Sequence, residues 1–242
     1  RAREILLQKL RAVQGQKDKL ACISGDRTSS CNEVLSAFTA RMGSDRFYMM
    51  PGDENTLHQA WQDLCKGTGM PGFDLENADT LLVLGPDLFE SWGTYVRNQK
   101  ILGLEQTRTI YVSPIQNNTA ALAQEWIPLP AEQMGYLALA LAYEILQLEE
   151  PGLYGIEGAQ EFKDFLSKNY SSGKLQNTLD MDPKKVRSLA RTLLKARRPL
   201  VIPGTISGQG GSRFEMFAGL SLNILLQRIN QKGGLQALPH AP

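Results

Sequence analysis

The chain has 242 residues, of which 42% are hydrophobic and 21% are charged, and 26 basic side chains face 25 acidic ones. This composition is ordinary for a soluble globular domain, and without a Lys/Arg block it excludes a dedicated nucleic-acid-binding surface. The longest strongly apolar run, residues 136–146, is shorter than the roughly 20 residues that a membrane-spanning helix needs. We therefore expect no direct membrane span, and other chains would have to anchor the protein at a membrane.

Short apolar runs alternate with helix-length segments along the whole chain. The predicted strands, in order, are 20–24, 46–50, 80–85, 108–113, 125–129 and 199–204. The predicted helices are 3–13, 31–42, 54–65, 92–103, 132–147, 158–169, 182–196 and 213–229, with a short helix at TAALAQ, 119–124. Strands and helices in alternation require right-handed crossovers. We therefore expect an α/β fold, with a mostly parallel sheet and helices on both faces.

The segment EEPGLYGIEG, 149–158, has the composition of a linker. It predicts a joint between a Rossmann-like α/β portion, 1–150, and a second α/β portion, 151–242. The sequence opens at Arg1 inside an amphipathic helix pattern and closes on the stub LPHAP. We therefore expect a fragment of a longer chain.

Cysteine and histidine indicate neither a metal centre nor a catalytic group. Cys22, Cys31 and Cys65 form no CxxC pair, which argues against a metal cluster, and isolated thiols are usually small core residues. His58 lies within a predicted helix and His240 lies in the terminal stub, neither with a partner in motif spacing. We predict no catalytic residue and no metal ligand.

The loop after the third predicted strand is LGPDLFESWG, 84–93. Its Gly85 would let the chain pass close to a ligand, and Asp87 offers a hydrogen-bond acceptor there. Asp87 is equally suited to cap the following helix. The cluster PGDEN, 51–55, is interpreted as a turn and a helix cap.

Two later loops also follow predicted strands. After Ser113, the residues Asn117 to Thr119 most simply cap the short helix. In GTISGQGGSRF, 204–214, Gly204 and Gly208 belong to a set of four glycines that could form an anion-binding nest before a helix. The loop matches neither familiar phosphate pattern, because no Gly-Lys-Ser/Thr follows and Arg213 replaces the last glycine of GxGxxG. A surface turn remains the alternative.

Taken in order, these pieces resemble the middle α/β portion of the molybdopterin oxidoreductases, which include formate dehydrogenase, dimethyl sulfoxide reductase and polysulfide reductase. ADTLLVLGPDLFESW resembles the strand and glycine turn of that family. TIYVSPIQNNTAALAQEWIPLPAEQMGYLALALAYEIL resembles its next strand, Pro loop and two helices. DPKKVRSLARTLLKARRPLVIPG and LSLNILLQRINQKGG resemble its later helices and strand.

The resemblance breaks at the positions that contact the cofactor. In the family, a strand ending in Asp-Pro-Arg and a Pro-Gly-Thr-Asp loop contact the guanosine end of the pterin dinucleotide. This chain has Ser113-Pro114-Ile115 and Pro130-Ala131-Glu132-Gln133 there. Loss of the acid removes a charge-assisted hydrogen bond of roughly 1.5–3 kcal/mol, and loss of the glycine restricts the loop. The resemblance thus implies a retained fold with degenerate cofactor positions: Gly85, Asp87, Ser113, Gln133, Gly204 and Gly208.

LGPDLFESWGTYV most resembles the polysulfide-reductase side of the family. That side includes cofactor-lacking subunits of the quinone reductase complex and of alternative complex III. The resemblance implies a non-catalytic scaffold or electron-relay subunit of a respiratory complex, peripheral to the cytoplasmic membrane and with the periplasmic side favoured. Its expected partners are iron-sulfur, cytochrome or quinone-interacting membrane subunits. Iron-sulfur clusters are expected elsewhere in the complex, and no molybdopterin guanine dinucleotide is expected in this segment.

Two alternatives remain open. The first is a fragment of an active molybdenum-bis(pterin guanine dinucleotide) oxidoreductase, in which Glu132, Gln133 and the loop 204–212 supply different contacts. The second is the central domain of a thiamin-diphosphate enzyme, because KARRPLVIPG resembles the start of a strand in those proteins. If the chain is a scaffold, we expect Ile115 and Trp92 to narrow the crevice at the carboxyl ends of the strands.

Overall fold

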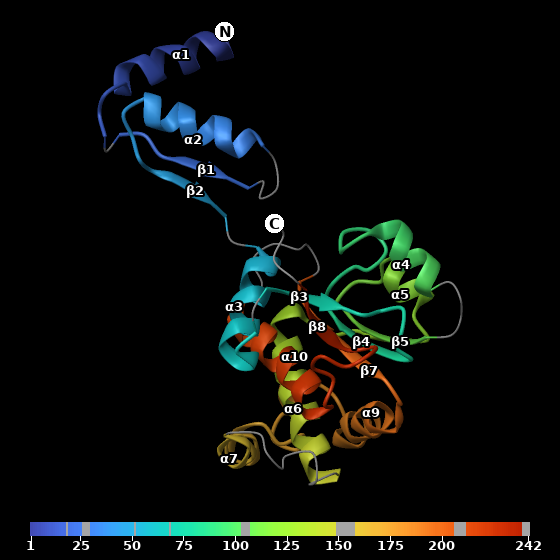
Figure 1. Ribbon diagram of the computed structural model, residues 1–242. Helices are drawn as coiled ribbons and strands as arrows, with labels where there is room; N and C mark the ends of the chain where they lie inside the picture. The colour runs from blue at the N-terminus through green and yellow to red at the C-terminus, as the bar shows by residue number, and fades with distance from the viewer. Residues whose placement is uncertain are drawn as a thin grey trace. The chain divides into compact units, whose positions relative to one another are not determined.

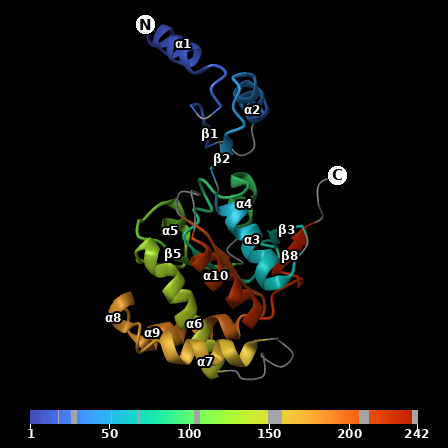
Figure 2. The same ribbon diagram turned by 90° about the vertical axis from the view of Figure 1, so that its left-hand side faces the viewer.

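The computed structural model describes residues 1–17, 19–25, 30–50, 52–67, 69–102, 107–148, 158–205 and 212–238 (Figures 1 and 2). The chain divides into two compact units, Arg1–Pro51 and Gly52–Pro242. The predicted linker 149–158 lies almost wholly outside the described residues. The division into portions 1–150 and 151–242 stays a prediction.

The first unit is a βαβ arrangement preceded by a helix. Helix α1 spans Ala2–Val13, and β1 (Cys22–Ser24) and β2 (Phe47–Met49) form a parallel pair joined through α2 (Cys31–Arg41). Parallel neighbours need such a crossover, because a tight turn can only reverse the chain. None of the buried hydrophobic side chains in the described part of the protein belongs to this unit.

The second unit contains a parallel sheet of four strands in the order β6-β5-β4-β7. The strands are β4 (Thr80–Leu84), β5 (Arg108–Val112), β6 (Glu125–Ile127) and β7 (Pro199–Pro203). Every residue of β4 and β7 is buried, which is typical of strands covered on both faces. From β4 the chain adds β5 and β6 on one side and later β7 on the other. The carboxyl ends of β4 and β7 therefore form the topological switch point, where such sheets usually bind ligands.

Side chains alternate between two hydrophobic layers along each strand, as the strand period of two requires. Leu82 and Val201 belong to the larger core, which includes α6 (Met134–Leu148), α9 (Pro183–Lys195) and α10 (Arg213–Leu225). Leu81 and Leu200 belong to the opposite layer, on the side of α4 (Tyr95–Leu102) and α5 (Asn118–Leu122). The predicted α/β fold with a parallel sheet flanked by helices is confirmed.

The remaining elements surround this core. Helix α3 (Asp53–Cys65) packs on α10, and α7 (Ala159–Asn169) packs on α6. The short α8 (Gln176–Leu179) follows α7 in the chain. A 3₁₀ turn, η1 (Ala131–Gln133), leads into α6. Asp182 caps α9, as predicted, because its side chain accepts a hydrogen bond from the Lys184 amide and Pro183 occupies the first turn. No helix in the described residues is both long and apolar enough to cross a membrane.

Two strands escaped prediction. β3 (Met70–Phe73) and β8 (Leu235–Leu238) pair antiparallel, 162 or more positions apart in the chain. The sequence Met-Pro-Gly-Phe lacks the usual strand composition. A Cβ atom on Gly72 would lie 2.7 Å from the Leu238 side chain, so a larger residue there would displace that side chain. A partner so distant in sequence leaves no local signal.

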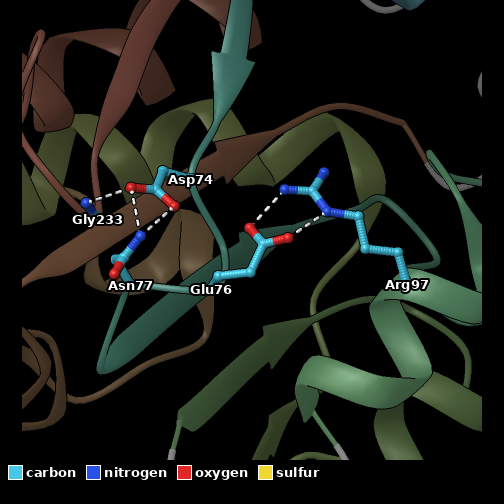
Figure 3. Close-up of polar contacts among 5 residues, drawn as sticks. All are labelled: Asp74, Glu76, Asn77, Arg97 and Gly233. Carbon is cyan, nitrogen blue, oxygen red and sulfur yellow. Dashed lines mark hydrogen bonds and ion pairs between the residues drawn. The ribbon is translucent and has the colours of Figure 1, made fainter.

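The loop between β3 and β4 is fixed by two polar clusters (Figure 3). The Asp74 carboxylate accepts hydrogen bonds from Asn77 Nδ2 at 2.9 and 3.0 Å and from the Gly233 amide at 2.8 Å. Glu76 forms a bidentate ion pair with Arg97 on α4, about half of each side chain being exposed. These contacts hold the amino end of β4 against both α4 and the turn before β8.

Several local predictions were wrong. The helix expected from residue 92 begins at Tyr95, and the helix expected to reach residue 229 ends at Leu225. The three thiols are not core residues: Cys31 is exposed, and Cys22 and Cys65 are partly exposed. Burial still raises the pKa of the Cys65 thiol to about 11.

Candidate functional site

The candidate site is the edge of the sheet where β4, β5 and β7 end. Gly85, Ser113 and Gly204 directly follow these three strands, and all three are buried. Their amides continue the ladder: Gly85 N donates to Val112 O at 3.0 Å, and Gly204 N donates to Leu84 O at 3.1 Å. The structure therefore brings together three of the predicted site residues on adjacent strands.

Gly85 and Gly204 lie in direct contact across the switch point. A Cβ atom on Gly85 would lie 2.7 Å from the Gly204 carbonyl oxygen and 3.3 Å from Met134 Sδ. A Cβ atom on Gly204 would lie 2.4 Å from Pro86 Cγ. Gly85 also has a φ of +98°, a conformation that residues with side chains rarely adopt. The glycines thus permit a close approach of two protein backbones.

Asp87 is buried and lies at the centre of a closed hydrogen-bond network. Its Oδ1 accepts from Thr119 Oγ1 at 2.5 Å and from the Phe89 amide at 3.1 Å, and its Oδ2 accepts from Asn117 Nδ2 at 2.8 Å. The alternative role of Asp87 as a cap for the following helix is wrong, because residues 88–93 form turns and α4 begins at Tyr95. The carboxylate instead joins the loop after β4 to the start of α5.

The same network reaches the switch point through Tyr111. The Tyr111 hydroxyl donates to the Gly85 carbonyl at 3.1 Å and accepts from Asn117 Nδ2 at 2.9 Å. Burial raises the pKa of Tyr111, and the hydrogen bond from Asn117 only partly opposes that rise. Asn117 is also the predicted helix cap, since its Oδ1 accepts from the Ala120 amide at 3.0 Å.

Ser113 is fully buried and uses its hydroxyl within its own loop. Ser113 Oγ donates to the Ile115 carbonyl at 2.9 Å and accepts from the Ile115 amide at 3.2 Å. Its carbonyl accepts from Trp126 Nε1 at 3.0 Å, which fixes the loop to β6. Because these partners belong to the protein itself, Ser113 serves the turn after β5.

A cavity of ≈310 Å³ lies beyond the ends of β6 and β7. Glu132 and Glu215 contribute carboxylates to its lining, and Gln133, a predicted site residue, is the next residue of η1. Thr205 also lines the cavity, and its amide and hydroxyl donate to Asp53 Oδ2 at 2.7 and 2.6 Å. None of the described lining residues is basic: they are Ala131, Glu132, Met134, Gly204, Thr205, Ser212 and Glu215.

The Asp53 contact differs from its predicted role. We expected PGDEN to cap the helix, but α3 has no side-chain cap bond, and Gly52 occupies the cap position. Asp53 instead binds Thr205, 152 positions further along the chain. Of the glycine-rich loop, Gly208 lies outside the described residues, whereas Ser212 forms a capping box with Glu215 at the start of α10.

Ile115 and Trp92 do not fill the crevice, contrary to our expectation. Ile115 is 53% exposed, and Trp92 packs edge-on against Phe73, with ring centroids 5.5 Å apart. Pro86 and Met134 contact the paired glycines in their place. The prediction failed because the direction of a side chain in a loop cannot be derived from its type.

The described residues contain no group of three or more His, Cys, Asp or Glu side chains that could hold a metal ion. His58 lies on α3, as predicted, and its Nε2 is buried without a hydrogen-bond partner among the described atoms. The residues that sequence reasoning missed, Pro86, Met134 and Thr205, have no distinctive type or spacing. They are identified only by their close contacts with Gly85, Gly204 and Asp53 in the structure.

Known proteins share sequence with this chain. No family model matches the chain. The chain is 37% identical, over 99% of its length, to the "menaquinone reductase, molybdopterin-binding-like subunit" of Nitratidesulfovibrio vulgaris, of which it covers 35%. Over 51% of its length it is 32% identical to the arsenate respiratory reductase molybdopterin-containing subunit of Chrysiogenes arsenatis, of which it covers 14%.

The fold is also similar to that of a solved enzyme. Acetylene hydratase from Pelobacter acetylenicus matches 93% of this chain with a TM-score of 0.65 and 16% sequence identity, over 32% of its own length. At that identity the match concerns the fold alone. The chain thus spans about a third of the length of the menaquinone reductase subunit and of acetylene hydratase.

Proposed function

The chain belongs to the molybdopterin-oxidoreductase-like proteins, and from that premise we propose that it forms the α/β core of a respiratory-complex subunit whose pterin dinucleotide site has been lost. Its role is then structural or electron-relaying rather than catalytic. The observation that carries the proposal is the direct contact of Gly85 with Gly204 at the switch point. Ligands of open α/β sheets bind in the crevice just beyond the carboxyl ends of the strands, and the contact between these two backbones leaves less room at that position.

The hydrogen-bonding groups at the strand ends also do not fit a dinucleotide. Ser113 stands where the resembled family has an acid, and its hydroxyl already has two partners in Ile115. Asp87 is an acid nearby, but three donors of the protein satisfy it: the Phe89 amide, Thr119 Oγ1 and Asn117 Nδ2. A guanine base would have to displace these bonds, and each displaced bond costs about 0.5–1.5 kcal/mol or more.

The charge of the neighbouring cavity disfavours a pyrophosphate. Glu132 and Glu215 line it, and the Asp53 carboxylate lies beside it through Thr205. Proteins that hold phosphates normally supply Lys, Arg or free backbone amides, since two like charges in a partly buried site repel. Among the described residues, neither this cavity nor the glycine contact offers a cation to the phosphates.

The partners and the location of the complex are part of the same proposal. The subunit from Nitratidesulfovibrio vulgaris is named as part of a menaquinone reductase. That name supports the proposal of a quinone-linked, membrane-associated complex, in which we expect iron-sulfur, cytochrome or quinone-interacting subunits as neighbours. The complex lies peripheral to the cytoplasmic membrane on its periplasmic side.

A second candidate function is an active molybdenum oxidoreductase. It is favoured by the cavity of ≈310 Å³ lined by Glu132, Met134 and Thr205, because Glu132 and the loop from 204 are the groups that this alternative uses. The partial match to a molybdopterin-containing subunit agrees with it. The thiamin-diphosphate alternative rested on residues 195–204 alone, and the family assignment removes its basis.

Metal and pterin analysis of the native full-length subunit separates the two candidates. We expect molybdenum, tungsten and oxidised pterin to be present far below one equivalent per subunit, in protein purified within its complex. Calorimetry with guanosine diphosphate should show no binding tighter than about millimolar, a free energy of roughly −4 kcal/mol. Stoichiometric metal together with pterin, or micromolar nucleotide binding, would establish the active enzyme instead.

A further inference from the structure

A second cavity lies at the opposite end of the sheet from the candidate site. Its volume is ≈590 Å³, within the range of small-molecule sites. Asp79, Thr107 and Arg198, which directly precede β4, β5 and β7, form one wall, and residues of α4 form the other. Because these strands are parallel, the three residues meet at the amino end of the sheet. All the described lining residues belong to the unit Gly52–Pro242, so the chemistry of the cavity is set within one unit.

Hydrogen bonds hold the strand-side wall of the cavity in place. The Asp79 amide donates to the Arg198 carbonyl at 3.1 Å, and the Asp79 carboxylate accepts from the Arg198 amide at 3.1 and 3.0 Å. The Asp79 carbonyl accepts from the Arg108 amide at 2.9 Å, and Thr107 Oγ1 donates to the Ala78 carbonyl at 3.2 Å. These bonds join the starts of three neighbouring strands and leave little freedom to the backbone of the wall.

The described lining of the cavity includes three basic and two acidic side chains, and both acids already have partners in the protein. Glu76 pairs with Arg97 (Figure 3), and Asp79 accepts from the Arg198 amide. Lys100 and the Arg198 guanidinium form no ion pair among the described residues. Arg198 Nε is covered by protein atoms and has no hydrogen-bond partner among the described atoms. A cation that has lost part of its hydration gains more from a bound anion than a fully exposed cation does.

Apolar side chains complete the lining and restrict the kind of anion. Ala78 and Ile101 are buried, and Val96 is exposed. A ligand therefore needs a carbon skeleton as well as a negative charge. A carboxylate matches the planar guanidinium through two parallel hydrogen bonds. A phosphate could form the same bonds, but the Glu76 and Asp79 carboxylates would repel its second negative charge.

We propose that this cavity binds a small organic acid, whose carboxylate pairs with Arg198 and whose carbon skeleton lies against Ala78, Val96 and Ile101. The terminal nitrogens of the Arg198 guanidinium hold the carboxylate, and Lys100 supplies a second positive charge. This inference goes beyond the role in a respiratory complex. It does not depend on whether a pterin is bound, because the cavity lies at the opposite end of the sheet from Gly85 and Gly204.

Calorimetry of the full-length subunit with hexanoate tests the proposal. Hexanamide, which lacks the charge, and inorganic phosphate, which lacks the carbon chain, are the comparison ligands. We expect hexanoate to bind with a Kd below about 1 mM, and about tenfold more tightly than either comparison ligand. The proposal is overturned if hexanoate does not bind, or if hexanamide binds equally well. Phosphate that binds as tightly as hexanoate would overturn the assignment to an organic acid.

Substitution of Arg198 locates the bound acid. Arg198→Gln should weaken hexanoate binding by about tenfold, because it removes the guanidinium that pairs with the carboxylate. Arg191→Gln is the matched control, since Arg191 lies on α9, is exposed and does not line the cavity. Equal affinities of these two variants would contradict the proposal.

A pair of substitutions at Val96 gives a second measurement, which decides if the Arg198 variant does not fold. Val96 is 72% exposed, so a polar residue there should leave the fold intact. Val96→Asp places a negative charge in the wall of the cavity and should weaken hexanoate binding several-fold. Val96→Asn has nearly the same shape without the charge and should weaken binding less. The same Kd for both variants would show that the carboxylate does not lie in this cavity.

Discussion

The two ends of the parallel sheet each carry a carboxylate cluster, and they differ in burial. At the carboxyl end, Asp87 is 5% exposed, and its hydrogen-bond partners among the described residues are neutral donors. At the amino end, Glu76 is about half exposed and pairs with Arg97 (Figure 3). Breaking the hydrogen bonds of a buried polar group lowers the free energy of unfolding far more than breaking an exposed ion pair does. At the carboxyl end, where the fold usually binds ligands, the buried acid is thus already bonded to the protein's own groups.

The largest effect should come from Asp87→Ala. It removes the acceptor of Thr119 Oγ1 and one of the two acceptors of the Phe89 amide and of Asn117 Nδ2, so we expect the free energy of unfolding to fall by about 3–5 kcal/mol. Urea denaturation of the full-length subunit measures this. Asp87→Asn keeps one acceptor oxygen and should cost less. A loss below about 1 kcal/mol for the alanine variant would show that the network is not structural.

Gly85→Ala should have the next largest effect. The new Cβ atom would meet the Gly204 carbonyl oxygen at 2.7 Å, and the φ of +98° would be strained, for an expected cost of about 2–4 kcal/mol. Gly173→Ala is the matched control, since nothing lies within 4 Å of its added Cβ atom. If both variants have the same unfolding midpoint, the two strand-end backbones are not in contact and the crevice is open.

Tyr111→Phe removes the hydroxyl that joins Asn117 to the Gly85 carbonyl, and we expect a loss of about 1–2 kcal/mol. The pKa of Tyr111 is raised by burial above its ordinary value of 10.0. The folded state therefore keeps the proton when the unfolded chain loses it. That contribution is complete below pH 10 and is lost as the pH rises through the folded pKa. Stability curves at alkaline pH should fall more steeply for the wild type than for the phenylalanine variant.

The smallest effect should come from Arg97→Met, which breaks the pair with Glu76. The side-chain hydrogen bond from Arg97 lowers the pKa of Glu76 below its ordinary value of 4.5. The stabilisation is therefore present above pH 4.5 and is lost as the pH falls through the folded pKa. Because both side chains are half exposed, we expect at most about 1 kcal/mol at neutral pH.

Lys100→Met on the same helix is the control for the Arg97 variant. It removes one positive charge from α4 and breaks no ion pair among the described residues. The difference between the two variants should disappear near pH 3. A difference that persists at that pH would assign the effect to packing of the Arg97 stem rather than to charge.

Much of the fold was predictable because its signals are local. The burial of β4, β5 and β7 follows from their continuous apolar runs, and α9 begins at the Asp182-Pro183 pair, as its cap predicts. β3 could not be predicted, because Met70 to Phe73 form a strand only through pairing with Leu235 to Leu238. The backbone groups of β3 are hydrogen-bonded by a segment that is distant in the chain, so residues 70–73 need no alternating pattern of apolar side chains.

Some features of the candidate site were likewise predictable from the sequence, and others were not. The sequence by itself determined that Gly85, Ser113 and Gly204 follow parallel strands, that an acid is missing at Ser113, and that the chain resembles the molybdopterin oxidoreductases. Only the tertiary structure decided that Gly85 touches Gly204 and that Asp53 binds Thr205. It also decided that Ile115 is exposed instead of filling the crevice. The physical reason is the distance along the chain between the residues in contact. Residue type and spacing determine the local conformation of each short segment, whereas contacts between segments more than 100 positions apart depend on how the layers pack.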